Sequence, residues 1–169
     1  MAYEFYEAQT VKYVREQEIG KGAELTFSPF SSCIAVVVKV GDDLMGAHLS
    51  KVGFNRLIGD AVKRANTDIP FSDEAAKRLR KQFPDAPDDV LILGCVPDWC
   101  NEATPKEYKG EWSVIHGYNQ LKASFKKMQN PVTVPDGQYG VKIQGGRIVH
   151  FKIAGAGEAK LPPAHLANW

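Results

Sequence analysis

The chain has 169 residues and a formal net charge of +1, from 21 Lys and Arg against 20 Asp and Glu. Domains typically hold about 100–200 residues, so we expect residues 1–169 to form a single domain. The balanced charge excludes the basic surplus of nucleic-acid-binding proteins, and we predict no nucleic-acid partner. The longest apolar runs, 33–38 and 90–96, are far shorter than the ~20 residues that span a membrane, so no membrane association is predicted.

The N-terminus and the cysteines bear on the cellular compartment. Residues 1–5 show neither the basic nor the apolar region of a secretory signal. Three cysteines make an odd count, whereas a secreted disulfide scaffold would carry an even and denser set. We expect a soluble protein of the cytoplasm, or one exported without a cleaved signal peptide.

The first predicted element after an ambiguous N-terminal stretch is a hairpin. Residues 34–40 are rich in β-branched side chains, 41–43 carry a turn signal, and 44–49 are apolar again. A loop of two residues, Gly41 and Asp42, would place Cys33 opposite Ser50.

Helical spacing follows the hairpin. The apolar stripe of residues 50–65 predicts one helix. A second begins after the N-cap Ser72 and ends before Pro84. Residues 90–96 form a short apolar strand, and a capping box at 104–107 introduces a further helix.

The last element is a hairpin around Gln144-Gly145-Gly146. A three-residue loop would pair Val141 with Val149 and keep the apolar side chains on one face, so this register is predicted. The order of elements indicates an α+β fold, with mainly antiparallel β-sheets in a β-sandwich-like arrangement and helices packed outside.

One pair of residues has the chemistry of a thiol nucleophile and its base. Cys33 begins the first strand of the 34–49 hairpin, and His48 lies near the end of the return strand. With a two-residue loop the two side chains share a face as diagonal neighbours, about 7–8 Å apart at Cα. Such a histidine can take the proton of a cysteine. A buried, inert cysteine at a strand start is the alternative.

Other candidate sites are weaker. Cys95, Cys100 and His116 offer zinc-binding atoms, but their spacing is loose and a fourth ligand is missing. The glycines at 155 and 157 lack the context of a phosphate-binding loop. We therefore predict no metal and no cofactor.

The segment from Ser31-Ser32-Cys33 to Gly46-Ala47-His48 resembles the Cys–His signature of the protein-glutamine deamidases. This superfamily includes the chemotaxis receptor deamidase CheD and the catalytic domain of cytotoxic necrotizing factor. The closing segment 145–151 also looks like the last hairpin of CheD. Two positions depart from the CheD pattern: Ser31 replaces a glycine, and the proline that often follows the histidine is absent.

The resemblance implies a fold, a reaction and a site. The family commonly completes its dyad with a threonine before the cysteine, or with a backbone carbonyl that orients the histidine. Thr26 is our choice for this third member, although Phe27 occupies the best-aligned position. Cys33 would attack the side-chain amide of a protein-bound glutamine as a thiolate paired with the His48 imidazolium. Backbone N–H groups of Ser32 and Cys33 would stabilise the oxyanion.

The predicted function is therefore that of a cysteine-dependent amidohydrolase. It would convert a glutamine of a protein substrate to glutamate with release of ammonia, in chemotaxis or as a bacterial effector or toxin. Two alternatives remain open at this point: a non-catalytic protein-binding module on the same fold, and another thiol acyl-transferase or peptidase.

Overall fold

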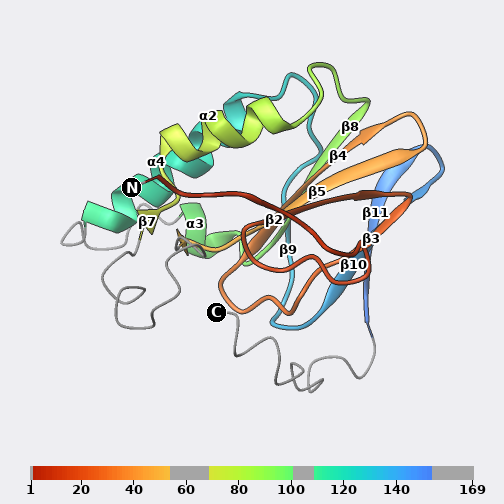
Figure 1. Cartoon of the computed structure of the whole chain (residues 1–169), viewed down its shortest axis with the longest axis horizontal. Coiled ribbons are helices and arrows are strands. Elements are labelled where there is room, and N and C mark those ends of the chain that lie inside the picture. Colours follow the sequence, from red (N-terminus) through yellow and green to blue (C-terminus); the bar gives the residue numbers. More distant parts are fainter. Residues whose placement is uncertain (1, 54–68, 101–108, 154–169) are drawn as a thin grey trace.

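The computed structural model describes residues 2–53, 69–100 and 109–153, which form a mixed α+β structure (Figure 1). The strands are β1 (Tyr6–Glu7), β2 (Glu18–Gly22), β3 (Glu24–Thr26), β4 (Ile34–Val40), β5 (Asp43–Leu49), β6 (Val52–Gly53), β7 (Ile69–Pro70), β8 (Asp89–Gly94), β9 (Val132–Thr133), β10 (Tyr139–Gln144) and β11 (Arg147–Lys152). The helices are α2 (Asp73–Gln82), α3 (Pro97–Cys100) and α4 (Lys109–Ala123).

The strands form three sheets. The largest has six strands in the order β1-β2-β5-β4-β8-β9, the second has the order β11-β10-β3, and β6 pairs with β7. Strand pairs are antiparallel except β1 with β2 and β8 with β9. The α+β class with mainly antiparallel sheets is therefore confirmed.

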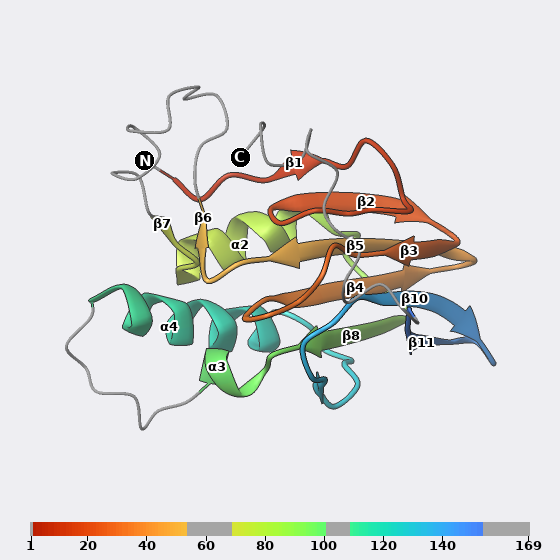
Figure 2. The ribbon, with the colours of Figure 1, turned by 90° about the horizontal axis from the view of Figure 1, so that it is seen from below.

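The two larger sheets and the helices make three layers. Helices α2 and α4 cover one face of the six-stranded sheet, and the three-stranded sheet lies on the other face (Figures 1 and 2). Alternate residues of β4 point into different cores: Val36 contributes to the core under the helices, and Val37 to the core between the sheets. The central strand β4 is thus buried on both faces, as its uninterrupted apolar sequence predicts.

The N-terminal hairpin has the predicted two-residue loop. Val40 pairs with Asp43, so Gly41 and Asp42 form the loop, and the register continues to Ile34 opposite Leu49. Gly41 has a φ of 60°, a left-handed conformation that glycine adopts without steric cost. This register sets the positions of Cys33 and His48 relative to each other.

Helix α2 is confirmed with its predicted N-cap. The Ser72 hydroxyl accepts a hydrogen bond from the backbone N–H of Ala75 at 3.3 Å, and Leu79 is fully buried against the sheet. Helix α4 passes so close to the start of α2 that a Cβ at Gly117 would meet the Phe71 carbonyl oxygen at 2.3 Å. The glycine in this helix therefore permits a close helix contact.

Two predicted elements lie partly or wholly outside the described residues. The helix expected over residues 50–65 falls mostly there, and its first residues form the short strand β6 instead, because Val52 pairs with Pro70. The capping box at 104–107 and the glycines at 155 and 157 also lie outside.

The predicted register of the C-terminal hairpin is wrong. Gln144 pairs with Arg147, and Val141 faces His150 rather than Val149. The loop is the two-residue Gly145-Gly146, with φ angles of 60° and 76°, as a type I′ turn requires. Both faces of this hairpin are partly apolar, because the Phe151 ring lies over Gly140 on the outer face. The register is therefore determined by the turn that the two consecutive glycines favour, and not by keeping all apolar side chains on one face.

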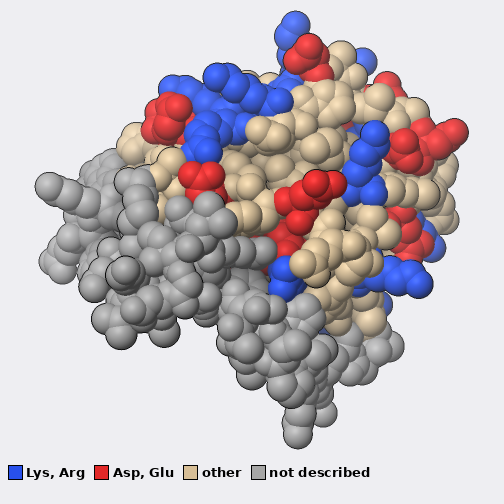
Figure 3. All heavy atoms as spheres, in the orientation of Figure 1, with Lys and Arg blue, Asp and Glu red and all other residues tan. Residues whose placement is uncertain are grey.

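The surface carries both signs of charge. Basic and acidic side chains are interspersed on the face shown in Figure 3, with basic atoms gathered over α2. Across residues 2–53, 69–100 and 109–153, no helix combines the length and the apolar character needed to cross a bilayer.

Candidate functional site

The structure brings Cys33 and His48 together. Cys33 lies directly before β4, and His48 lies in β5 opposite Ala35. The Cys33 Sγ atom and a ring nitrogen of His48 lie within 4.8 Å of each other. Both side chains are buried, with 2% of Cys33 and none of His48 exposed. The diagonal arrangement expected from the two-residue loop is therefore present.

The Nδ1 atom of His48 has two contacts that orient the ring. It lies 3.0 Å from the Ser28 hydroxyl oxygen and 3.2 Å from the Val14 carbonyl oxygen. Because a carbonyl oxygen can only accept a hydrogen bond, the Val14 contact assigns the proton of the neutral ring to Nδ1. The lone pair then resides on Nε2, which is buried and has no hydrogen-bond partner among the described residues. Nε2 is therefore the unprotonated nitrogen of the neutral ring.

Backbone hydrogen bonds fix these two partners of His48. The Val14 carbonyl also accepts from the Ser28 N–H at 2.9 Å, and the Val14 N–H donates to the Thr26 carbonyl at 2.7 Å. Thr26, the sequence-predicted third member, therefore supports Val14 through its main chain. The groups that the structure places against the His48 ring nitrogen belong to Ser28 and Val14.

Aromatic rings enclose the imidazole. Phe30 packs edge-on against the His48 ring with centroids 4.9 Å apart, and Phe27 does so at 6.0 Å. Desolvation in this apolar setting lowers the pKa of His48 to about 4, because burial disfavours the charged imidazolium. The ring is neutral at physiological pH and can act as a base.

Glu16 is a further neighbour of the thiol that the sequence analysis did not select. The Cys33 Sγ–H donates to the Glu16 Oε1 atom at 3.3 Å. Burial, followed by the adjacent Glu16 carboxylate, raises the pKa of the Cys33 thiol above its ordinary range. Burial therefore favours a neutral thiol and a neutral imidazole at rest, whereas the resemblance implies a thiolate–imidazolium pair.

The loop before β4 is held by contacts to β8 and α3. The Trp99 Nε1–H donates to the Ser32 carbonyl at 2.8 Å, and the Cys95 N–H donates to the Cys33 carbonyl at 2.9 Å. The Ser32 backbone N–H is directed at the Cys33 sulfur and opposes the rise in its pKa. Of the two N–H groups predicted to bind an oxyanion, that of Ser32 therefore faces the sulfur.

The backbone of Cys33 also requires a glycine on the neighbouring strand. A Cβ at Gly94 would lie 2.4 Å from the Cys33 carbonyl oxygen, and Gly94 has a φ of 139°. Only glycine adopts this conformation readily. Gly94 is thus part of the support that positions Cys33.

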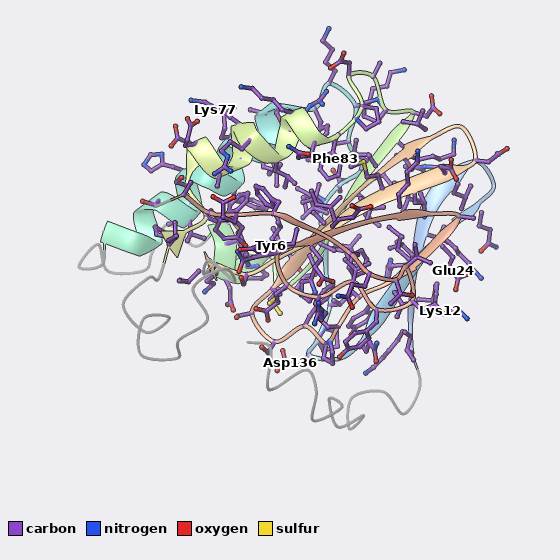
Figure 4. The ribbon with its side chains drawn as sticks, viewed as in Figure 1. Tyr6, Lys12, Glu24, Lys77, Phe83 and Asp136 are labelled. Carbon is purple, nitrogen blue, oxygen red and sulfur yellow. The ribbon has the colours of Figure 1, made fainter. Side chains whose placement is uncertain are left out.

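The donor atoms near the thiol include three types that cations bind. Ligand atoms of Glu16, Cys33 and His48 all lie within 4.8 Å of one another, one fewer than the four ligands of a closed structural zinc site. Among the described residues, Cys95, Cys100 and His116 do not form such a group. Cys95 instead donates to the Ser31 carbonyl at 3.1 Å and lies 3.9 Å from the Asp136 carboxylate, which is labelled in Figure 4.

No protein-family model matches this chain, and no curated protein or solved structure is significantly similar to it. The resemblance to the glutamine deamidases thus rests on the quoted residues.

The residues around Cys33 and His48 that the sequence did not predict differ in how clearly the sequence signals them. Ser28 lies in the serine-rich loop before Cys33, so its closeness to the cysteine in sequence is a signal that could have found it. Val14 acts through its carbonyl, which every residue carries, so no residue type signals it. Glu16 precedes Gln17, whose φ of 65° is the only left-handed non-glycine value in the described chain, and sequence gives no sign of this conformation.

Proposed function

We propose that the protein is a cysteine-dependent amidohydrolase that deamidates a glutamine side chain of a partner protein. The observation that carries the proposal is the arrangement of His48. Its Nδ1 is tied to Val14 and Ser28, its Nε2 is buried without a hydrogen-bond partner among the described residues, and one of the two ring nitrogens lies within 4.8 Å of the Cys33 Sγ atom. This is the nucleophile, base and orienting group of thiol acyl transfer. The CheD-like fold and the role as an effector or toxin are part of the same proposal.

The reaction follows from these positions. Nε2 of His48 takes the thiol proton as Cys33 Sγ attacks the amide carbon, and the oxyanion accepts a hydrogen bond from the Ser32 N–H. The protonated His48 then donates its proton to the leaving ammonia, and a thioester remains. His48 next removes a proton from water, which attacks the thioester, releases glutamate and restores the thiol.

Because the pKa of Cys33 is raised and that of His48 is lowered, the proposed reaction requires the proton to leave the thiol only as the sulfur attacks the amide carbon. At rest the thiol keeps its proton and shares it with Glu16. Cys33 is only 2% exposed. A bound substrate must therefore displace the protein atoms that cover its sulfur. The resting state is therefore protected, and nucleophilicity develops when the substrate is bound.

The test uses cell lysate as the source of substrates. The purified protein is incubated with lysate, and glutamine-to-glutamate conversions are mapped by mass spectrometry. We expect a defined set of conversions with the parent and with Cys100→Ser, which removes an exposed thiol, and none with Cys33→Ser. An unchanged map with Cys33→Ser would overturn the proposal.

The same samples separate the alternatives. New protein termini that require Cys33 would indicate a peptidase, and incorporation of an added primary amine would indicate an acyl-transferase. A binding module would retain a partner equally well with Cys33→Ser and cause no conversion. Stoichiometric metal in the purified protein, lost on His48→Gln, would replace the catalytic proposal with a cation site.

A further inference from the structure

Glu16 is held beside the nucleophile by a fixed neighbour. Gln17 is fully buried, its N–H donates to the His48 carbonyl at 2.7 Å, and its side-chain amide donates to the Glu4 carbonyl at 3.0 Å. These contacts maintain the left-handed φ of Gln17. A strained conformation that neighbouring contacts maintain is frequent at functional sites. Here it aims the preceding carboxylate at the Cys33 sulfur.

Glu16 lies within reach of an amide that reacts at the Cys33 sulfur. The attacked carbon approaches a nucleophile to about 3–3.5 Å, and Glu16 Oε1 lies 3.3 Å from the same sulfur. An amide whose carbonyl oxygen accepts from the Ser32 N–H can turn its NH2 group toward Glu16, because both groups lie against the same sulfur atom. A carboxylate has about four lone-pair positions, so Glu16 can accept from this NH2 group in addition to its present contacts.

Substrate and product differ in the atom that would meet Glu16. A carboxamide donates two hydrogens and is neutral, whereas the glutamate product is an anion that only accepts. A carboxylate facing a second carboxylate is repelled, and this repulsion is strong where burial lowers the effective dielectric constant. We propose that Glu16 is the specificity-determining residue that admits a neutral carboxamide to Cys33 and rejects a carboxylate. This role rests on the proposed function, because it concerns the substrate of the same site.

Two alkylating reagents test the proposal without knowledge of the substrate. Iodoacetamide and iodoacetate react with thiols by the same displacement and differ only in carrying an amide or a carboxylate. The rate ratio of the two reagents at Cys33 is measured by peptide mass spectrometry, with the exposed Cys100 as the internal reference. A change in the pKa of the Cys33 thiol, or in the access of solvent to it, alters the reaction rates of both reagents alike. Such a change therefore cancels in the rate ratio.

We expect the preference for iodoacetamide at Cys33 to exceed that at Cys100 by about tenfold or more, the size of a single charged hydrogen bond. Glu16→Gln should abolish this excess, and Glu16→Asp, which keeps the charge, should retain part of it. Glu24→Gln removes an exposed carboxylate at the start of β3 (labelled in Figure 4) and should leave the ratio unchanged.

An excess that persists in Glu16→Gln, or a parent ratio at Cys33 equal to that at Cys100, would overturn the proposal. The outcome is independent of the lysate assay. A Glu16-dependent ratio without any deamidation would contradict the proposed function and keep Glu16 as an amide-selecting group. Deamidation together with a rate ratio that is the same in the parent and in Glu16→Gln would support the proposed function and contradict the role of Glu16.

Discussion

The carbonyl oxygen of Val14 lies 3.2 Å from Nδ1 of His48, although the two residues are 34 positions apart in the chain. The contact joins the N-terminal segment to strand β5 and fixes the tautomer of the ring. Ser28 makes the second contact, at 3.0 Å. The orientation of the proposed base therefore depends on two segments that precede Cys33 in sequence.

If the proposed function holds, Ser28→Ala should slow the proposed deamidation about tenfold and lower the free energy of unfolding only slightly. Loss of one orienting contact should raise the barrier by about 1.4 kcal/mol, or reduce the rate about tenfold, while the free energy of unfolding falls by about 1 kcal/mol. The measurements are the lysate conversion rate and urea denaturation. Ser31→Ala, at an exposed position of the same loop, is the control; equal rates for the two variants would contradict the role of Ser28.

His48 should make the folded state sensitive to acid. Its ordinary pKa is 6.5, and burial lowers it to about 4 in the folded protein. Between these values the unfolded chain binds more protons than the folded chain, so the free energy of unfolding falls as pH falls. This contribution is complete above about pH 6.5 and is lost progressively toward about pH 4.

Urea denaturation of the parent and of His48→Gln measures the effect. Between about pH 7 and pH 4.5 the parent should lose roughly 2–3 kcal/mol more than the variant, at about 1.4 kcal/mol for each pH unit below the ordinary pKa. An equal loss in both proteins would show that the ring titrates normally. Histidine NMR gives a second measurement, in which the His48 ring stays neutral near pH 5.

Gly94→Ala should disturb the site and the fold together. The added methyl group would lie 2.4 Å from the Cys33 carbonyl oxygen, at a φ of 139° that alanine adopts only with strain. We expect a loss of about 3 kcal/mol or more in the free energy of unfolding, together with faster alkylation of Cys33. Gly41→Ala, in an open turn with no atom within 4 Å of the added Cβ, should cost only about 1 kcal/mol. Similar losses in both variants would contradict the crowding at Gly94.

The turn of the C-terminal hairpin should respond to the φ requirement of its two glycines. Asn tolerates a positive φ, and Asn-Gly suits a type I′ turn. Gly145→Asn should therefore change the melting temperature little. Gly145→Val should destabilise by about 2 kcal/mol, because a β-branched residue strongly resists a positive φ. Thermal denaturation of both variants tests the two-residue loop, and equal melting temperatures would contradict it.

Local sequence signals account for much of the fold. Strand β4, the Gly41-Asp42 turn and the cap of α2 each follow from a few neighbouring residues, and the structure has all three. The C-terminal hairpin shows where such reasoning fails. The Phe151 ring covers Gly140, and the Lys142 ammonium lies 5.6 Å from the centroid of this ring. Phe151 is thus covered on the outer face of the sheet without entering the core. The apolar pattern of the sequence alone could therefore not predict the register.

The candidate site was predictable to the extent that it depends on one hairpin. Cys33 and His48 follow from the parity of a two-residue loop. The contacts of Val14 and Glu16 depend on where the N-terminal segment returns to the sheet, which is a long-range property. Residue type could not reveal a carbonyl acceptor, and the charge of Glu16 alone resembles that of an ordinary surface carboxylate.

The central position of β4 has a consequence for how the molecule fluctuates. Its backbone is hydrogen-bonded to β5 on one side and β8 on the other, and both of its faces are buried. Its amide hydrogens should exchange with solvent only when the whole domain unfolds, whereas the two-residue strands β1 and β9 can open by local fraying. Cys33 directly precedes this strand, whose amides should exchange most slowly. Glu16 instead precedes β2, whose partner β1 should open by local fraying.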